Sequence, residues 1–503
     1  MPGHLVLPGC DPWRGEWIPT IRSARFLLKI FSILAIIWIT APSAAVASDA
    51  GTINATKTPI KHLITIMMEN HSFDNIFGKY PYSSNISSKT LNLTVPNDLL
   101  GLHSLPSGLS PVVSGSFATP DPNEGYGPYH TDWNGGMMNS FVNGSGPQSM
   151  SYFTASQMGP EWDIAQQFAI GDCYFSSELS ETLPNRLYSL AGFTPVKEDS
   201  GPPPYVPVGQ TIFSELSAYN VSWAYYFLHP SVSSYPLNSI YGMGKYSANI
   251  QSWKNFTSQV QSGTLPSVSW LSDLGGGASG FSQHPSDNVL NGEIWLISVI
   301  NTLMRSPIWN SSAIFITYDE GGGYYDHVPP PLVDGHQLGF RVPFIVVSPF
   351  AKEDYVSGTL LNHASMLAFI DYNWNMPALN RFVLDSNIPL DFFYFSQIRS
   401  PDPFSFGNNL VIPQFATMTS SSADGHSNVS SLYPVLPQIN YSSLPYERFG
   451  NSSFNMSDIN ASVFVKSNSA YNGPVDLYLS IVAGIIAALI LAVAIIIRPW
   501  KKR

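Results

Sequence analysis

The chain has 503 residues, of which 44% are hydrophobic, which is enough for a large buried core. Only 11% are charged, well below the usual quarter, and the net charge is −11. This composition argues against nucleic acid as a ligand, because phosphate backbones are bound by clustered Lys and Arg and no basic stretch precedes the C-terminal tail.

The N-terminus has the form of an export signal. Three basic residues between positions 22 and 29 precede an apolar stretch at 30–40, and Ala-Val-Ala at 45–47 fits a small-residue cleavage site. Residues 1–47 are therefore predicted to be a signal peptide or an N-terminal anchor.

Two apolar runs, at 63–68 and 313–318, read as buried strands that each end in a pair of oxygen-bearing side chains. In a parallel α/β sheet, ligands bind at the carboxyl ends of the strands, so we expect the two pairs to meet there. Three carboxylates and one amide suit a hard divalent cation. The alternative is that each pair simply begins a surface loop. The four residues are Glu69, Asn70, Asp319 and Glu320.

The segment between these runs offers a hydroxyl nucleophile, Thr182, in the sequence Thr-Leu-Pro. The same sequence is typical of a helix start with Thr182 as the N-cap, and the two interpretations are compatible. A helix N-terminus there would also present backbone N–H groups to a phosphate. Asn185 and Arg186 follow directly, and Arg186 could clamp a phosphoryl oxygen or form a structural ion pair.

Further elements surround these motifs. The spacing of apolar residues predicts helices over 162–168 and 288–305, and the run at 342–347 predicts a core strand that ends at Ser348-Pro349. Strands that alternate with helices indicate a mainly parallel sheet covered on both faces.

The C-terminal end of the chain predicts a membrane tether. Residues 416–476 are rich in Ser and Asn and read as a stalk. Residues 477–497 contain no charge and are followed by RPWKKR; about 20 apolar residues suffice to cross a bilayer. The basic tail, 498–503, should remain cytoplasmic, which puts a catalytic domain at 48–415 outside the cell on a single-pass anchor.

Twelve Asn-x-Ser/Thr sequons accompany this topology. The export signal favours glycosylation over chance occurrence in an Asn- and Ser-rich chain. Asn70 also fits the pattern but is assigned to the metal site. The twelve are Asn54, Asn85, Asn92, Asn143, Asn220, Asn255, Asn310, Asn428, Asn440, Asn451, Asn455 and Asn460.

Four segments, in this order, resemble the phosphoesterase family: MMENHSFDNIFG, TLPNRLYSLAG, ITYDEGGGYYDHVPPP and GFRVPFIVVSPF. That family holds bacterial phospholipases C and AcpA-type acid phosphatases and belongs to the alkaline-phosphatase-like superfamily. The resemblance spans roughly residues 61–373. It implies an α/β fold, a three-layer α/β/α sandwich with a mainly parallel central sheet, to which this chain adds the stalk and one transmembrane helix.

The resemblance also implies roles for the candidate residues. Glu69, Asn70, Asp319 and Glu320 match the family's ligands for a divalent metal ion, whose identity stays open. Thr182 stands where the family carries its Ser or Thr nucleophile, so attack would give a phospho-threonine intermediate.

Other candidates follow from motif context. His130, in GPYHTDWNGG, and His284, in SQHPSDN, resemble His-containing segments of the family, and either could bond phosphoryl oxygens or protonate the leaving group. Asp326 and His327 are expected to support the loop behind Asp319, and Asn185 and Arg186 to bind phosphate or support the site. His71 and His363 are further candidates.

The sequence thus predicts an extracellular, membrane-anchored, metal-dependent phosphoesterase whose substrate is a small phosphomonoester or a phospholipid. Acid phosphatase and phospholipase C both remain open, because the nucleophile motif allows both. One alternative is an inactive surface-layer or adhesion glycoprotein that keeps the fold, although the intact metal set argues against it. A sulfatase-like relative is disfavoured, since no Cys stands in a C-x-P-x-R setting.

The charge composition also predicts an acidic medium. Near pH 2 most carboxylates are neutral, and a protein then carries the full charge of its Lys and Arg. This chain has only 23 such residues, so its positive self-repulsion in acid would be small. We expect an acidic pH optimum, while glycan shielding at neutral pH is the alternative explanation.

Overall fold

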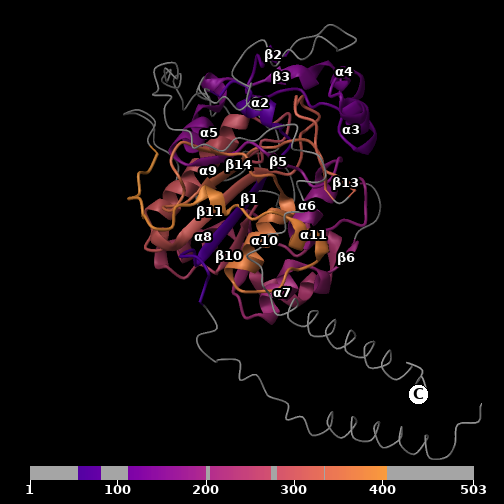
Figure 1. Ribbon diagram of the computed structural model, residues 1–503. Helices are drawn as coiled ribbons and strands as arrows, with labels where there is room; N and C mark the ends of the chain where they lie inside the picture. Colours follow the sequence, from indigo (N-terminus) through magenta and orange to yellow (C-terminus); the bar gives the residue numbers. More distant parts are fainter. Residues whose placement is uncertain (1–54, 81–110, 200–203, 273–279, 334, 405–503) are drawn as a thin grey trace, which may run out of the picture. The chain divides into compact units, whose positions relative to one another are not determined.

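An eight-stranded sheet forms the centre of the computed structural model, which describes residues 55–80, 111–199, 204–272, 280–333 and 335–404. The strand order is β15-β4-β14-β11-β1-β10-β7-β9 (Figure 1). The strands are β1 (His62–Met68), β4 (Ala169–Gly171), β7 (Trp223–Phe227), β9 (Ile250–Ser252), β10 (Val268–Leu271), β11 (Ser312–Tyr318), β14 (Phe344–Val347) and β15 (Tyr355–Ser357).

The two central strands, β1 and β11, are the apolar runs predicted from the sequence. They pair in parallel, from His62 opposite Ser312 to Met68 opposite Tyr318. Because both strands end at the same level, the residue pairs that follow them begin side by side. This register places the start of the pair Glu69-Asn70 next to the start of the pair Asp319-Glu320, as predicted from the sequence.

The sheet is mixed rather than wholly parallel, because β14 runs antiparallel to both of its neighbours, β11 and β4. The predicted strand over 342–347 is shortened to β14 at its start. Pro343 has no N–H for the ladder, and the N–H of Val342 donates to the Tyr174 carbonyl at 2.9 Å. The other seven strands of this sheet share one direction, as the prediction of a mainly parallel sheet requires.

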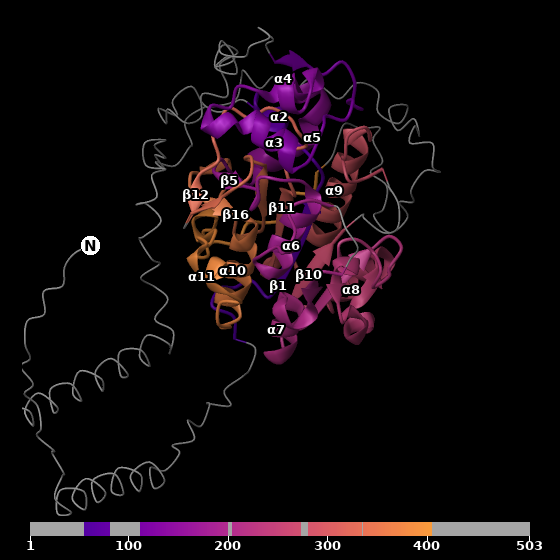
Figure 2. The ribbon, with the colours of Figure 1, turned by 90° about the vertical axis from the view of Figure 1, so that its right-hand side faces the viewer.

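Helices cover both faces of the sheet, which gives the expected three layers. In Figure 2 the sheet lies between α8 and α9 on one side and α10 and α11 on the other. Helix α5 packs on α9, and α6 packs on α10. The helices are α5 (Ala155–Gln167), α6 (Thr182–Ala191), α7 (Ile212–Ala218), α8 (Trp253–Ser262), α9 (Val289–Met304), α10 (His363–Asn373) and α11 (Arg381–Asp385).

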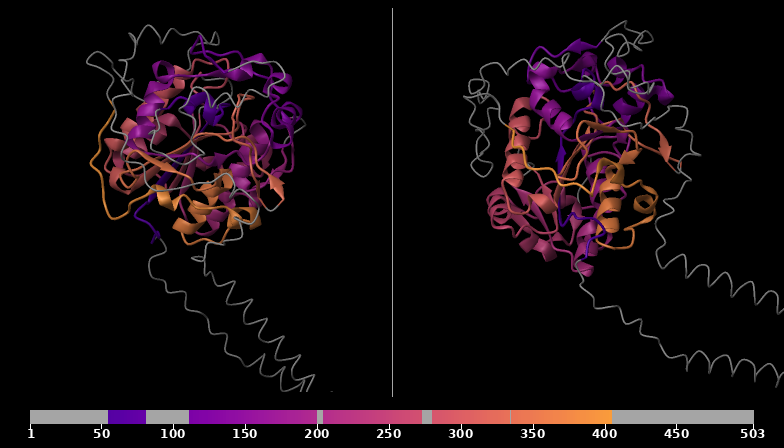
Figure 3. Two further views of the ribbon diagram at one scale, coloured as in Figure 1. Left: turned by 45° about the horizontal axis from the view of Figure 1, so that its top comes forward. Right: turned by 60° about the vertical axis from the view of Figure 1, so that its left-hand side comes forward.

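Short elements gather beyond the ends of β1 and β11. Helices α2 (Phe73–Phe77), α3 (Tyr126–Trp133) and α4 (Phe141–Gly144) keep to one end of the sheet in both views of Figure 3. The two-stranded pairs are β2 (Val112–Val113) with β3 (Ser151–Tyr152), β5 (Tyr174–Phe175) with β16 (Leu361–Asn362), β6 (Val206–Pro207) with β8 (Ile240–Tyr241), and β12 (Leu332–Val333) with β13 (His336–Gln337). Short 3-10 turns are η3 (Asn134–Gly136), η4 (Pro147–Met150), η5 (Val208–Gln210), η6 (Leu237–Ser239), η7 (Met243–Asn249), η8 (Trp309–Ser311) and η9 (Leu390–Phe392).

The predicted signal, stalk and membrane span, at 1–47, 416–476 and 477–497, lie outside the described residues. Within the described part, no helix combines the length and apolarity needed to cross a bilayer. Four sequon asparagines lie in it, and all are exposed, whereas Asn70 is fully buried. The four are Asn143, Asn220, Asn255 and Asn310. Glycosylation and the division into domains stay predictions.

Candidate active site

The ends of β1 and β11 are joined by backbone contacts. The N–H groups of Asn70 and Glu320 both donate to Asp319 Oδ1, at 3.3 and 2.9 Å. Asn70 has a left-handed φ of 68°, which Asn tolerates better than most residues. A Cβ on Gly322 would lie 1.9 Å from the Asn70 carbonyl oxygen, so the two loops can approach this closely only with glycine there.

Thr182 lies beside this junction. Its Oγ1 is 3.5 Å from Asn70 Oδ1, and the residue is 8% exposed. Helix α6 begins at Thr182 with Glu181 as the N-cap residue, so the predicted N-cap role of Thr182 is wrong by one position. The N–H of Leu183 donates to Asp199 Oδ1 at 2.6 Å, and Pro184 has none. These two positions therefore offer no N–H group to a phosphate.

Asn185 and Arg186 support the site from inside. The Asn185 side chain accepts from Glu178 N–H and donates to the carbonyls of Ser180 and Glu181, which holds the chain just before Thr182. Because Asn185 is fully buried with its amide used in this way, it supports the loop and does not reach a phosphate.

Arg186 forms the structural ion pairs that the sequence left open. Its guanidinium lies 3.3 Å from Glu69 Oε1 and 3.0 Å from Asp319 Oδ2, and the residue is 1% exposed. Burial lowers the pKa of Arg186, but the two carboxylates raise it by more, so the guanidinium stays charged. Arg186 thus ties the two strand-end acids together.

The side chain of Glu320 is a suitable candidate for a metal ligand. It is fully buried; its Oε2 accepts from the Tyr129 hydroxyl and the Gly322 N–H, while Oε1 has no hydrogen-bond partner. Burial, with the charges of Glu124 and Asp319, raises the pKa of Glu320 well above its usual range. A buried, unpartnered carboxylate oxygen beside further acids fits a divalent cation, which would satisfy the oxygen and offset the negative charge.

The two candidate histidines differ in position. Burial lowers the pKa of His284, but the charges of Glu69, Glu124 and Asp121 raise it by more, so the net shift is upward. The charges of these three carboxylates therefore act on His284. His130 does not join them in the described structure: its Nδ1 bonds the Tyr126 carbonyl at 2.8 Å, and its ring contacts are with other residues of α3.

The remaining histidines have structural partners. His363 Nε2 donates to the Asp319 carbonyl at 2.7 Å, and its Nδ1 accepts from the Tyr174 hydroxyl. His71 bonds Asn75 and the Gln283 carbonyl, each at 2.8 Å. Burial lowers the pKa of His363 to about 3 and that of His71 to about 4, so both are neutral supports.

Asp326 and His327 belong to a buried ion cluster behind the site. Together with Asp74 they could hold a metal by spacing alone, since their ligand atoms lie within 4.8 Å of one another. However, the Arg341 guanidinium already contacts Asp74 at 2.9 Å and Asp326 at 3.2 Å. The carboxylates of Asp74 and Asp326 are thus already paired with a cation of the protein, which is compatible with the predicted supporting role of Asp326 and His327.

The sequence did not single out two residues that contact the predicted ligands, Glu124 and Tyr129. Glu124 Oε1 accepts from Asn70 Nδ2 at 2.7 Å, and Tyr129 bonds Glu320. Burial, with the charge of Asp121, raises the pKa of Glu124 to about 8 despite the opposing charge of His284. The only sequence signal was the position of Tyr129 next to His130, in the segment that resembles the family.

The model of the Phosphoesterase family matches residues 60–377, which is well over half of the chain. The chain belongs to the phosphoesterase family. Curated relatives agree: "Phospholipase C A" of Mycobacterium tuberculosis is 28% identical over 68% of this chain and 78% of its own length. "Non-specific phospholipase C6" of Arabidopsis thaliana is 28% identical over 61% and 64%. The protein is therefore a hydrolase that acts on phosphate esters.

Solved structures add little to this assignment. A protein of the alkaline phosphatase superfamily from Vibrio parahaemolyticus aligns over 62% of this chain and 80% of its own, with 9% identity and a TM-score of 0.29. The lipoteichoic acid synthase LtaP from Listeria monocytogenes aligns over 67% and 80%, with 9% identity and a TM-score of 0.31. These scores are too low to assign a fold family by themselves.

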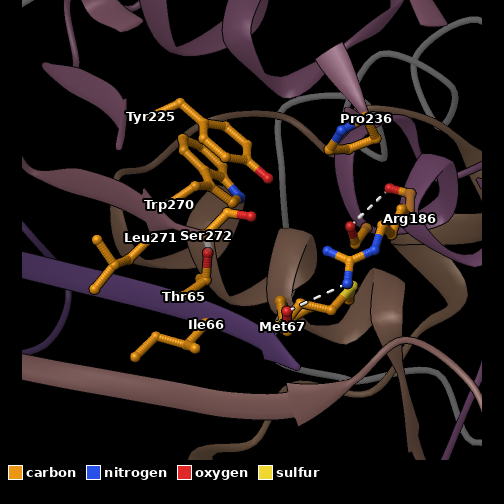
Figure 4. A pocket seen from close by; sticks show the side chains of 11 residues that line it. Thr65, Ile66, Met67, Arg186, Tyr225, Pro236, Trp270, Leu271 and Ser272 are labelled. Carbon is orange, nitrogen blue, oxygen red and sulfur yellow. Dashed lines mark hydrogen bonds between the residues drawn. The ribbon is translucent and has the colours of Figure 1, made fainter. Parts of the chain in front are cut away.

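This phosphoesterase also has a hollow beside Arg186, on the same face of the sheet as Met67. Figure 4 shows the rings of Tyr225 and Trp270 on one side of it and Arg186 on the other. The hollow has an empty volume of about 360 Å³, including space open to solvent. Little more than a water molecule fits inside it, so the hollow assigns no part of a substrate.

Proposed function

We propose that this phosphoesterase is a metal-dependent phospholipase C that acts through a phospho-threonine intermediate. The observation that carries the proposal is the contact between the Thr182 hydroxyl and the Asn70 carboxamide, 3.5 Å apart, in a chain that belongs to the phosphoesterase family. Thr182 and Asn70 come from segments far apart in sequence, and both are buried. The unpartnered oxygen of Glu320, at the end of β11, adds a candidate metal ligand.

A divalent cation held by Glu69, Asn70, Asp319 and Glu320 would lower the pKa of a hydroxyl beside it and offset charge on phosphoryl oxygens. Two neighbouring residues hold these candidate ligands in position. Arg186 holds the carboxylates of Glu69 and Asp319 in place, and His363 holds the Asp319 backbone.

In the first chemical step, Thr182 Oγ1 bonds to phosphorus and loses its proton to water, while the bond from phosphorus to the leaving alcohol oxygen breaks. His284 can supply the proton that this oxygen takes up; its Nδ1 faces the Pro285 carbonyl, so Nε2 is the nitrogen available for transfer. A water oxygen then bonds to phosphorus while the bond from phosphorus to Thr182 Oγ1 breaks; a proton from this water restores the Thr182 hydroxyl, and the phosphorylated product leaves.

Phospholipid is the proposed substrate, because the curated relatives that cover about two thirds of this chain carry the name phospholipase C. Acid phosphatase activity on small phosphomonoesters remains the second candidate, favoured by the acidic medium that the composition predicts.

The proposed location is the outer face of a cell membrane. The predicted export signal, the charge-free segment at 477–497 and the basic tail support it, and the four exposed sequons of the described part are compatible with it.

The deciding experiment compares a phosphatidylcholine analogue with a small phosphomonoester, using purified protein with and without a chelator. We expect turnover of the phospholipid analogue to exceed that of the monoester, and the chelator to abolish both. Elemental analysis that finds no stoichiometric metal in an active enzyme would overturn the metal-dependent mechanism. Preference for the monoester would establish the phosphatase alternative.

A further inference from the structure

One segment that precedes and begins α3 reaches across the ends of β1 and β11. It contributes Glu124 to Asn70 and, five residues later, Tyr129 to Glu320. The Asn123 carbonyl also lies 2.9 Å from where a Cβ of Gly323 would stand, so the segment packs directly on the glycine loop after β11. Both side chains contact the predicted ligands from outside the ligand set.

Glu124 determines which end of the Asn70 amide faces the site. An Asn side chain has an oxygen that can bind a cation and an NH₂ group that cannot, and the two ends are nearly equal in shape. Because Asn70 Nδ2 donates to Glu124 Oε1 at 2.7 Å, Oδ1 is left on the side of Thr182, 3.5 Å from its hydroxyl. Loss of the Glu124 acceptor would free the amide to turn.

Tyr129 acts on Glu320 in the same way. Its hydroxyl and the Gly322 N–H both donate to Oε2, which leaves Oε1 buried and without a partner. The Tyr129 ring is 1% exposed and packs against Phe340 at 5.4 Å between ring centroids, so the hydroxyl has little freedom to move. One carboxylate oxygen is thus tethered and the other is presented.

We propose that Glu124 and Tyr129 are positioning residues that orient Asn70 Oδ1 and Glu320 Oε1 toward a bound divalent cation. The inference rests on the proposed metal site and adds two residues to it. In the GPYHTDW motif, the residue that contacts a predicted ligand is then Tyr129, through Glu320, and not the neighbouring His130.

The test measures cation affinity directly. Metal-free full-length protein is titrated in turn with Mn²⁺, Zn²⁺ and Ca²⁺, with calorimetry for all three and electron paramagnetic resonance for Mn²⁺. Supporting residues of this kind typically change metal affinity by 10–100-fold, so we expect Tyr129→Phe and Glu124→Ala each to raise Kd by about 10-fold or more. Glu124→Gln keeps an oxygen that accepts from Asn70 and should raise Kd by less than about 3-fold.

Tyr325→Phe is the matched control, because Tyr325 lies in the same apolar cluster as Tyr129 and loses the same atom. It should leave Kd unchanged. Equal affinity in wild type, Tyr129→Phe and Glu124→Ala, with unaltered unfolding midpoints, would refute the positioning role while leaving the proposed function intact. A wild-type protein that binds none of the three cations would overturn the metal site itself and the inference with it. If Glu124→Ala fails to fold, the comparison of Tyr129→Phe with Tyr325→Phe still decides.

Discussion

Thr182 is a plain hydroxyl whose reactivity depends on its surroundings. It is the first residue of α6, it is 8% exposed, and its oxygen faces the Asn70 amide rather than bulk water. The hydrogen bonds around it are made by other residues: the Asn185 side chain donates to the Ser180 carbonyl just before the helix, and Asp199 accepts from the Leu183 N–H. The Thr182 side chain can therefore be changed without removing the contacts that hold the loop.

Thr182→Ala should lower kcat by at least about a thousand-fold, because it removes the attacking oxygen, and should leave folding and cation affinity largely intact. Thr182→Ser should keep more activity than Thr182→Val, which has the shape of threonine but no hydroxyl. Steady-state kinetics and thermal unfolding of the three variants check this. Near wild-type turnover by Thr182→Ala would show that another group is the nucleophile.

The residues next to predicted strands could be found from the sequence, and those that reach the site from a loop could not. Glu69 and Asp319 follow apolar runs, so the strand-end rule locates them. Glu124 and Tyr129 meet the site only because an irregular segment folds over it, and local sequence does not encode that approach. The role of Arg186 was open for the same reason, since its partners lie at the ends of two distant strands.

At the scale of elements, Arg341 joins the three segments that carry the site. Its guanidinium contacts Asp74 in α2 at 2.9 Å, Asp172 between β4 and β5 at 3.0 Å, and Asp326 after β11 at 3.2 Å. Asp74 follows Asn70 in the chain, Asp172 precedes Thr182, and Asp326 follows Glu320. One buried arginine thus fixes the relative position of the predicted ligands and the candidate nucleophile.

Arg341→Met should destabilise the fold by about 3–5 kcal/mol, because three buried carboxylates would lose their cation. Arg381→Met is the control: Arg381 pairs with Asp385 on the surface of α11 and should matter by no more than about 0.5 kcal/mol. Denaturant unfolding at pH 7 measures both. A loss below about 1 kcal/mol for Arg341→Met would mean that the cluster does not hold these segments together.

Elements with a strong apolar period were predicted well, and those interrupted by proline were not. The helix predicted over 288–305 is α9, which begins after Asn288 as N-cap. The helix predicted over 162–168 begins earlier, as α5, because Thr154 and Gln157 form a capping box and the helix continues through Pro160 with a kink at Met158. Pro160 thus lies inside the helix, just after the kink at Met158.

At the scale of the whole molecule, the proposed topology predicts release of the catalytic domain. Protease applied to intact cells should cut the Ser/Asn-rich segment at 416–476 and free a soluble, active fragment, since that segment would lie outside the membrane. Activity in the supernatant and immunodetection of the cell pellet measure this. An enzyme that is protected in intact cells and cut only after lysis would reverse the predicted orientation.

The core contains carboxyl groups that burial favours in their protonated form. Glu161 and Glu293 lie between α5 and α9 and are fully buried. The Tyr318 hydroxyl oxygen lies 3.1 and 2.9 Å from the two oxygens of Glu161, and it is also within hydrogen-bond distance of Gln283 Oε1. One hydroxyl proton cannot serve three acceptors, so a proton on Glu161 completes this network. Burial raises the pKa of Glu161 from 4.5 to about 7.

The sign of the pH effect follows from this shift. A carboxyl whose folded-state pKa is raised stabilises the fold fully below its unfolded pKa of 4.5, and the contribution is lost as pH rises through about 7. Burial raises the pKa of Asp172 to about 7, which acts in the same direction, whereas neutral His71 and His363 act in the opposite direction as pH falls below 6.5. A single variant is needed to separate these contributions.

Glu161→Gln keeps the shape of the side chain and removes its titration, so its melting temperature should fall less between pH 5 and pH 8 than that of the wild type. We expect the difference to be about 3 °C or more, given how melting temperature scales with free energy in large domains. Glu198→Gln, at an exposed position, should keep the wild-type pH dependence. Calorimetric melting across this range decides. The same pH dependence in wild type and Glu161→Gln would show that Glu161 is ionised in the folded protein, and that the buried carboxyl network does not favour an acidic medium.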